Sequence, residues 1–170
     1  MNNNMQILNE KVMAVCPIEN VYFQEDGLIG IVYKDPDIST DQQKQAAQQV
    51  ISEWPLQEKK LEKLAKIDEE WEAAIAQGWN SNQGFSLGLS ANDVALISGV
   101  FALAKEAAAL NLPLPQIIAL DNTAISFTSI NEMVQLLLQY GSARAQLSSV
   151  FASRRKAVEN ATSIEEIDGV

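Results

Sequence analysis

Carboxylates are the most frequent side chains in this sequence that can act as acids, bases or ligands, and they gather in two short runs. The runs are Asp68-Glu-Glu-Trp-Glu72 and Glu165-Glu-Ile-Asp168. Paired carboxylates cleave glycosides only where a cleft gives the two groups different environments. Both runs instead have the pattern of charged helical segments. We therefore predict no catalytic residues and expect that the chain is not an enzyme.

Histidine is absent, and Cys16 is the single cysteine among the 170 residues. Ser-His-Asp and Cys-His catalysis, histidine-ligated metals and an intramolecular disulfide are thereby excluded. Asp35-Pro-Asp37 lacks the glycine and the final glutamate of a calcium loop. The loop from Gly78 to Gly88 is rich in Gly and Asn, but no Walker-type lysine follows it. We expect no metal and no cofactor, and we interpret Cys16 as a buried structural thiol.

The chain is acidic, with 12 lysines and arginines against 22 aspartates and glutamates and a formal net charge of −10. This charge excludes binding of nucleic acid by a general basic surface. The arginines, Arg144, Arg154 and Arg155, all lie near the C-terminus. Together with Lys156 they are interpreted as cations that stabilise the C-terminal end of a helix. The first residues lack a signal-peptide pattern, and no apolar run reaches about twenty residues, so we expect no membrane partner.

Residues 1–54 are predicted to form a small α-β-β-α module. Apolar spacing predicts a helix over Gln6–Val15, and a β-hairpin follows it. A capping box at Thr40-Asp-Gln-Gln43 begins the next helix, which Pro55 is expected to break or kink.

Residues 81–170 are predicted to form a helix, a hairpin and a long helix. Capping boxes at Ser90–Asp93 and Ser129–Glu132 begin the two helices, and the second helix extends to about Asn160. A last cap at Thr162–Glu165 begins a terminal turn. The first helix carries two apolar stripes, so we expect it to be buried on more than one side. The predicted fold class is α+β, mostly α.

Both hairpins are predicted to turn through two residues, at Asp26-Gly27 and at Asp121-Asn122, because these residues tolerate positive φ. Turn length fixes which residues face each other. The expected pairs are Phe23 with Gly30, Val21 with Val32, Tyr22 with Ile31, and Ile118 with Ile125. The side chains expected to face the C-terminal helices are Ile118, Leu120, Ile125 and Phe127.

Residues 55–80 are predicted to form a charged helix whose apolar residues fall at heptad spacing. Lysines 59–66 precede acidic residues 68–72, an order that opposes the helix dipole and that an antiparallel neighbour would complement. One interpretation is a solvated linker helix with one side on its own domain, and the other is a protein–protein contact helix. The candidate partner contacts are Leu61, Leu64, Trp71, Ile75, Tyr22 and Tyr33.

The C-terminal half resembles DUF4376, a domain of unknown function common in tailed-phage and prophage proteins. The residues that carry the likeness are Ile125-Ser-Phe-Thr-Ser-Ile-Asn-Glu132, Tyr140, Arg154-Arg155 and the ending Ala157-Val-Glu-Asn-Ala-Thr-Ser-Ile-Glu-Glu-Ile167. The hairpin begins with Leu114-Pro-Gln-Ile-Ile where the family usually has a polar aromatic opening. At the N-terminus, Val12–Val21 with the following hairpin and Gln/Ala-rich helix is similar to small phage tail-region proteins of the XkdW type.

These resemblances imply a structural protein of a phage tail, present in the virion after synthesis in the host cytoplasm. They transfer no functional residues. We expect an adaptor or cap at the baseplate or tail fibre, in several copies, that binds other tail proteins. A tail-fibre assembly chaperone that leaves before maturation is the alternative. A third reading is a small ligand-binding domain with an apolar pocket between the second hairpin and the two C-terminal helices.

Overall fold

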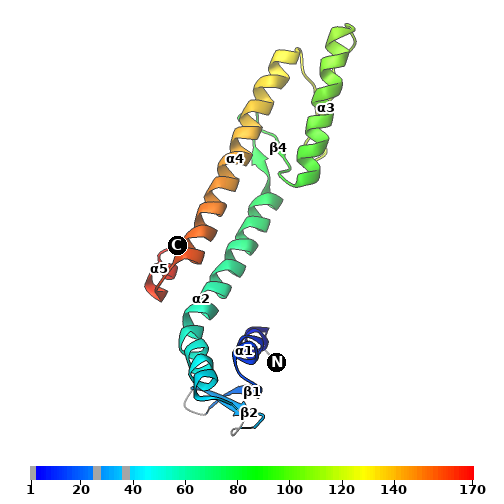
Figure 1. Ribbon diagram of the computed structural model, residues 1–170. Helices are drawn as coiled ribbons and strands as arrows, with labels where there is room; N and C mark the ends of the chain where they lie inside the picture. The colour runs from blue at the N-terminus through cyan, green and yellow to red at the C-terminus, as the bar shows by residue number, and fades with distance from the viewer. Residues whose placement is uncertain (1–2, 25–27, 36–38) are drawn as a thin grey trace. The chain divides into compact units, whose positions relative to one another are not determined.

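Helices make up most of the chain, and short antiparallel hairpins join them (Figure 1). The structure is a computed structural model that describes residues 3–24, 28–35 and 39–170. The predicted class, α+β and mostly α, is confirmed. In chain order the elements are α1 (Asn3–Val15), β1 (Ile18–Phe23), β2 (Ile29–Tyr33), α2 (Asp41–Gln77), β3 (Trp79–Asn80), β4 (Ser86–Leu87), α3 (Ala91–Ala109), β5 (Ile117–Ile118), β6 (Ala124–Ile125), α4 (Ile130–Asn160) and α5 (Ile164–Asp168).

The chain forms two units with separate cores. One unit comprises Met1–Leu64 with Val158–Val170, and the other comprises Ala65–Ala157. The predicted segments 1–54, 55–80 and 81–170 stay a prediction, because contacts within one chain do not test which segments fold alone.

The core of the first unit is built from α1, the β1–β2 hairpin and the start of α2. Leu8 and Val12 lie one helical turn apart on α1 and are fully buried, and Val21 and Trp54 pack into the same cluster. Cys16 directly after α1 is buried as predicted, and its Sγ lies 3.7 Å from the Ser39 hydroxyl. The N-terminal module is therefore a helix and a hairpin closed by α2.

Helix α2 begins with the predicted capping box. The Gln43 N–H donates to the Thr40 hydroxyl, and the Thr40 N–H donates to the Gln43 side chain at 2.9 Å. Pro55 was expected to break or kink this helix; the break is wrong, because the helix continues through Pro55 to Gln77, and the kink stays a prediction. Proline removes a single backbone hydrogen bond, and a helix with packed residues on both sides of it can absorb that loss.

The register of the β1–β2 hairpin differs from the prediction by one residue. Tyr22 faces Gly30 and Phe23 faces Ile29, and the Gln24 N–H donates to the Leu28 carbonyl at 2.7 Å. The predicted turn at Asp26-Gly27 lies outside the described residues. The Gln24–Leu28 hydrogen bond continues this observed register beyond the strand ends.

The core of the second unit lies between α3, the β5–β6 hairpin and α4, which runs beside α3 (Figure 1). Ile97 and Ala104 of α3 meet Met133 and Leu136 of α4 there. A small hairpin, β3–β4, precedes α3 in the loop from Gly78 to Gly88. It begins after Gly78, whose φ of +75° and contact with the Leu87 carbonyl leave no room for a Cβ.

The β5–β6 hairpin also differs from the predicted register by one residue. Ile117 faces Ile125, and the loop has three residues because the Asn122 N–H donates to Ala119 and the Ala119 N–H to Thr123. A turn followed by one left-handed residue, Asn122 with φ of +66°, is the common three-residue hairpin.

This shift reverses the side chains of β5, because neighbouring residues of a strand point to opposite faces. Ile117 and Ala119 are buried, whereas Ile118 and Leu120 are 58% and 47% exposed. Ile125 packs against the core as predicted. Phe127 does so as well.

Helices α4 and α5 begin with the same five-residue motif, Thr-Ser-Ile-X-Glu. The serine hydroxyl accepts the N–H of the glutamate, and the glutamate accepts the N–H of the threonine: Glu132 from Thr128, and Glu166 from Thr162. The predicted cap of α5 is therefore one residue too early, because Ser163 rather than Thr162 is the N-cap. These backbone hydrogen bonds hold the pKa of both glutamates below its ordinary range.

Candidate interaction surface

Helix α3 has one face in the core and one face in solvent. Ile97 and Ala104 are buried against α4. On the opposite side Leu96, Leu103 and Leu110 are 69%, 63% and 67% exposed. The expectation that both apolar stripes are buried is therefore wrong, because this chain covers only the first stripe. A row of exposed leucines this regular is uncommon on a monomeric surface and marks contact sites.

The outer face of α3 repeats every seven residues, or about two helical turns. The repeat places alanines directly before the three leucines, at 95, 102 and 109. Gly99 lies between the first two pairs, and a Cβ there would meet no atom within 4 Å. A shallow groove of about 820 Å³ follows this face, lined by Asn92, Ala95, Leu96, Gly99, Val100, Ala102 and Leu103. The leucines form ridges and the small residues form the depressions between them.

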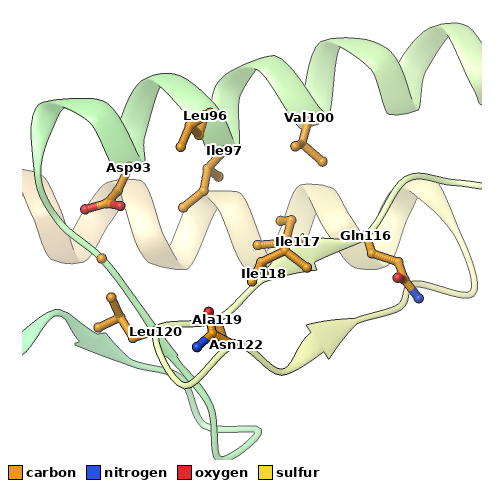
Figure 2. A pocket seen from close by; sticks show the side chains of 11 residues that line it. Asp93, Leu96, Ile97, Val100, Gln116, Ile117, Ile118, Ala119, Leu120 and Asn122 are labelled. Carbon is orange, nitrogen blue, oxygen red and sulfur yellow. The ribbon is translucent and has the colours of Figure 1, made fainter.

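The β5–β6 hairpin extends this surface. Ile118 and Leu120, which the register turns outward, form one wall of a groove of about 390 Å³, and Leu96 and Val100 of α3 form the other. Figure 2 shows the α3 side chains on one side of this groove and those of the hairpin on the other. We call the exposed leucines of α3, the half-buried Val100 between them and the outward residues of the hairpin the α3 face: Leu96, Val100, Leu103, Leu110, Ile118 and Leu120.

A second groove, of about 490 Å³, lies between α3 and α4. Phe101 and Leu137 line it, and Arg144 lies at its edge. The Arg144 Nε donates to the Leu89 carbonyl at 3.1 Å, and its guanidinium stacks on the Trp71 ring at 4.6 Å. The Arg144 side chain therefore has structural partners already.

Tyr140 also lines this second groove. Its hydroxyl donates to the Gly88 carbonyl at 2.7 Å, and burial raises its pKa. The groove matches the position of the pocket expected for a ligand-binding domain, but its polar side chains Tyr140 and Arg144 already bind the Gly88 and Leu89 carbonyls of the loop before α3.

The N-terminal unit has a smaller exposed apolar patch on the β1–β2 hairpin. Tyr22, Leu28 and Val32 are 44%, 63% and 40% exposed. The Tyr22 ring lies across Gly30, where a Cβ would be 2.4 Å from the tyrosine Cζ. An aromatic ring over a strand glycine fixes the register and keeps the ring at the surface. Tyr22, one of the predicted contacts, is thus a rigid surface group.

The other predicted contact residues are half-buried by their own chain. Leu61 packs against the core of the first unit and Ile75 against the core of the second. Trp71 meets Phe151 edge-to-face at a centroid distance of 5.3 Å. Leu64 is half-buried as well. Tyr33 is half-buried in the first unit, where burial raises its pKa and Lys44 lies 6.0 Å from its ring centroid. Whether a partner contacts these residues stays a prediction.

The acidic end of α2 pairs with α4 inside the second unit. Arg154 binds Glu70 at 2.6 Å, and Arg155 binds Asp68. The predicted role of these arginines at a helix C-terminus is wrong, because α4 has no basic residue in its last turn. In the first unit Lys60 takes that role and donates to the Glu159 carbonyl at 2.8 Å. The charge order along α2, unfavourable for an isolated helix, is thus complemented by α4.

Sequence reasoning missed the α3 face as a candidate site. The three leucines form the second of the two apolar stripes that the sequence predicts on this helix, and that stripe was expected to be buried. The signal was present in the repeat of Ala-Leu pairs every seven residues, which is typical of helix–helix contacts. The neighbouring helix α4 covers the stripe with Ile97 and Ala104 and leaves the leucines of the other stripe exposed.

Comparisons with known proteins give no relative for this chain. No family model, no curated protein and no solved structure matches it. Within the described residues no group of three or more acidic or cysteine side chains is placed to hold a metal ion. None of the helices that the structure describes is both long and apolar enough to span a membrane. The resemblances to DUF4376 and XkdW-type proteins stay predictions.

Proposed function

We propose that this chain is a non-enzymatic structural protein of a phage tail, an adaptor at the baseplate or tail fibre that acts through protein–protein contacts. The observation that carries the contact role is the α3 face, where Leu96, Leu103 and Leu110 are each more than 60% exposed. Ordered leucines on a rigid helix favour a protein partner. The assignment to a tail is supported by the sequence resemblance of the C-terminal half.

An adaptor needs two contact surfaces, and the described residues of each unit include an exposed apolar surface. The first is the β1–β2 patch around Tyr22, and the second is the α3 face. Each lies on secondary structure fixed by its own core, so each can bind without the other. This pair of surfaces favours an adaptor over a cap that uses one.

Mass spectrometry of purified virions tests the proposal. We expect the chain in mature particles at a constant ratio to a baseplate or fibre protein. Its absence from particles would overturn a virion role. A strict requirement for soluble fibre protein during co-expression would then favour the chaperone alternative.

Complementation of a deletion tests the α3 face itself. The double variant Leu96→Ser/Leu103→Ser should fail to enter particles although it folds. Leu138→Ser is the matched control, because Leu138 is 68% exposed on α4 of the same unit. Normal incorporation of the double variant would show that the α3 face is not the contact surface. Circular dichroism of the purified variants checks that both fold.

A further inference from the structure

We propose that the α3 face binds a second copy of this chain, as an antiparallel pair of α3 helices related by a two-fold axis at Gly99. The inference deepens the proposed contact role by naming one partner. It depends on the order of residues along the outer side of α3, which is complementary to itself. A two-fold interface requires one surface that fits its own copy.

The first argument is the symmetry of the repeat about Gly99. Residues at the same height, to within one residue, on either side of position 99 meet when two copies run antiparallel, so Asn92 meets Glu106 of the second copy and Glu106 meets Asn92. Gly99 then faces Gly99, and the absence of side chains there allows the two backbones to approach closely. Asn92 donates through its amide, and Glu106 accepts through its carboxylate.

The same symmetry decides which flanking residues meet. We call the line of contact between the two α3 helices, from Asn92 to Glu106, the seam. A two-fold axis perpendicular to the helices and to the line joining them leaves each lateral edge of the seam on the same side in both copies. Leu103 therefore meets Leu96 of the second copy on one edge, and Ala102 meets Ala95 of the second copy on the other. Alanines along one edge let the helices lie close, and leucines along the other provide the apolar contact.

The groove beside the hairpin lies on the leucine edge, because Leu96 and Val100 line both it and the outer side of α3. Leu103 of one copy lies at the height of Leu96 of the other and can enter this groove. There it covers Ile118 and Leu120 of the second copy, which the chain alone leaves exposed. Each copy thus inserts its Leu103 into the groove of the other copy and receives the other Leu103 in its own groove.

Charge is the second argument. The chain carries a formal net charge of −10, so two copies repel each other over most approaches. Residues 92–120 contain three charged groups, Asp93, Lys105 and Glu106, which sum to −1, and the Asp93 carboxylate is bound in the capping box with Ser90. The α3 face is thus a nearly neutral surface on an acidic protein. A parallel pair would place the two Glu106 carboxylates side by side, whereas the antiparallel pair places each beside an amide.

Area sets the expected strength. The seam from Asn92 to Glu106 is about 22 Å long and one helix, about 10 Å, across. Even with the hairpin groove, it buries less than the roughly 800 Å² per partner of a standard interface. We therefore expect a concentration-dependent dimer with a dissociation constant on the order of 1–100 μM.

Analytical ultracentrifugation of the full chain from about 1 to 500 μM tests the pairing. The wild type should shift from monomer to dimer across this range. Leu103→Ser should raise the dissociation constant at least tenfold, and the matched control Leu138→Ser should leave it within about twofold. A wild type that stays monomeric throughout, or a dimer insensitive to Leu103→Ser, would overturn the proposal.

Disulfide trapping tests the antiparallel arrangement, in a Cys16→Ala background that removes the native thiol. Gly99→Cys should cross-link to itself, because the two positions meet at the axis. Glu106→Cys alone should not, since seven residues on each side separate the two copies by about 21 Å. The pair Asn92→Cys/Glu106→Cys should cross-link. Cross-linking of Glu106→Cys alone would indicate a parallel pair and contradict the arrangement.

The tests of self-pairing can fail independently of the test of the virion role. A monomeric chain that is still incorporated into virions would overturn the self-pairing and leave the adaptor role standing, with a different protein on the α3 face. A dimeric chain absent from virions would support the pairing and overturn the virion role.

Discussion

At the scale of single residues, the glycine in the middle of α4 lowers the stability of that helix. Gly141 lies in the middle of α4, and a Cβ there would meet no atom within 4 Å. We expect Gly141→Ala to raise the free energy of unfolding by about 0.5–1 kcal/mol, because alanine loses less backbone entropy in a helix. Urea denaturation measures the change.

Gly88→Ala is the contrasting control. Its Cβ would lie 2.3 Å from the Asp93 carboxyl carbon, so the variant should disturb the Ser90–Asp93 capping box and lower stability. A destabilised Gly141→Ala would mean that a neighbouring group packs closely against Gly141 in solution.

Two glutamates link stability to pH. The pKa values of Glu132 and Glu166 are lowered chiefly by the backbone N–H groups of Thr128 and Thr162. A carboxyl whose pKa is lower in the folded state contributes stability above its unfolded pKa and loses it as the pH falls through the folded pKa. The stability of the chain should therefore fall below the ordinary glutamate pKa of about 4.3.

The double variant Glu132→Gln/Glu166→Gln should weaken this dependence, since an amide oxygen accepts the same hydrogen bond without titrating. Urea midpoints at pH 6.5 and pH 3 measure the difference. Glu165→Gln is the matched control, because it removes a charge beside Glu166 and keeps the threonine contact. An unchanged pH dependence in the double variant would show that the caps do not cause it.

At the scale of elements, the register of β5–β6 decides which isoleucine supports the fold. Ile117 is 2% exposed and Ile118 is 58% exposed. Ile117→Ala should lower the free energy of unfolding by about 2–5 kcal/mol, because it leaves a cavity in the core. Ile118→Ala is the matched control and should cost less than about 1 kcal/mol. The reverse order would restore the register predicted from the sequence.

The pairing of α2 with α4 in the second unit has a charge-swap test. Arg154→Glu should destabilise the unit, and adding Glu70→Arg should recover part of the loss. Both groups are partly exposed, so a double-mutant cycle should give a coupling of only about 0.2–1 kcal/mol. The coupling should shrink in 1 M salt. A salt-independent coupling would point to packing, for example of the nearby Phe151 ring.

The sequence predicted helix starts well and strand registers poorly, for physical reasons. A cap is a contact within four residues, so Thr40–Gln43 and Ser90–Asp93 can be recognised from spacing alone. A register depends on whether a loop has two or three residues, and Asp121-Asn122 suits both lengths. The one-residue difference in the loop then turned the whole of β5 over.

The α3 face could be seen in the sequence but not assigned. Periodicity shows that Leu96 and Leu103 form an apolar stripe, and it does not show whether the same chain covers that stripe. The number of neighbouring elements decides this point, and it is a property of the folded unit. The charged helix α2 was the converse case, because the residues predicted to contact a partner, Trp71 and Ile75 among them, lie half-buried against their own chain.

For the whole molecule, net charge and apolar contact oppose each other when two copies meet. The chain carries −10, so association brings like charges together, while the α3 face contributes nearly neutral apolar contact. Added salt screens the repulsion, with a Debye length of about 10 Å at 0.1 M and about 3 Å at 1 M, and leaves apolar burial intact. We expect the dimer dissociation constant to fall several-fold between 50 mM and 500 mM NaCl.

The sign of this salt effect separates two possible contact surfaces. Association that pairs the lysines of α2 in one copy with its acidic residues in another would weaken as salt rises, whereas association through α3 should strengthen. Sedimentation of the wild type at three salt concentrations measures the sign, and Leu103→Ser run in parallel shows whether the α3 face is responsible. A dissociation constant that rises with salt in the wild type would indicate that the copies associate through the charged surface of α2. It would contradict association through the α3 face.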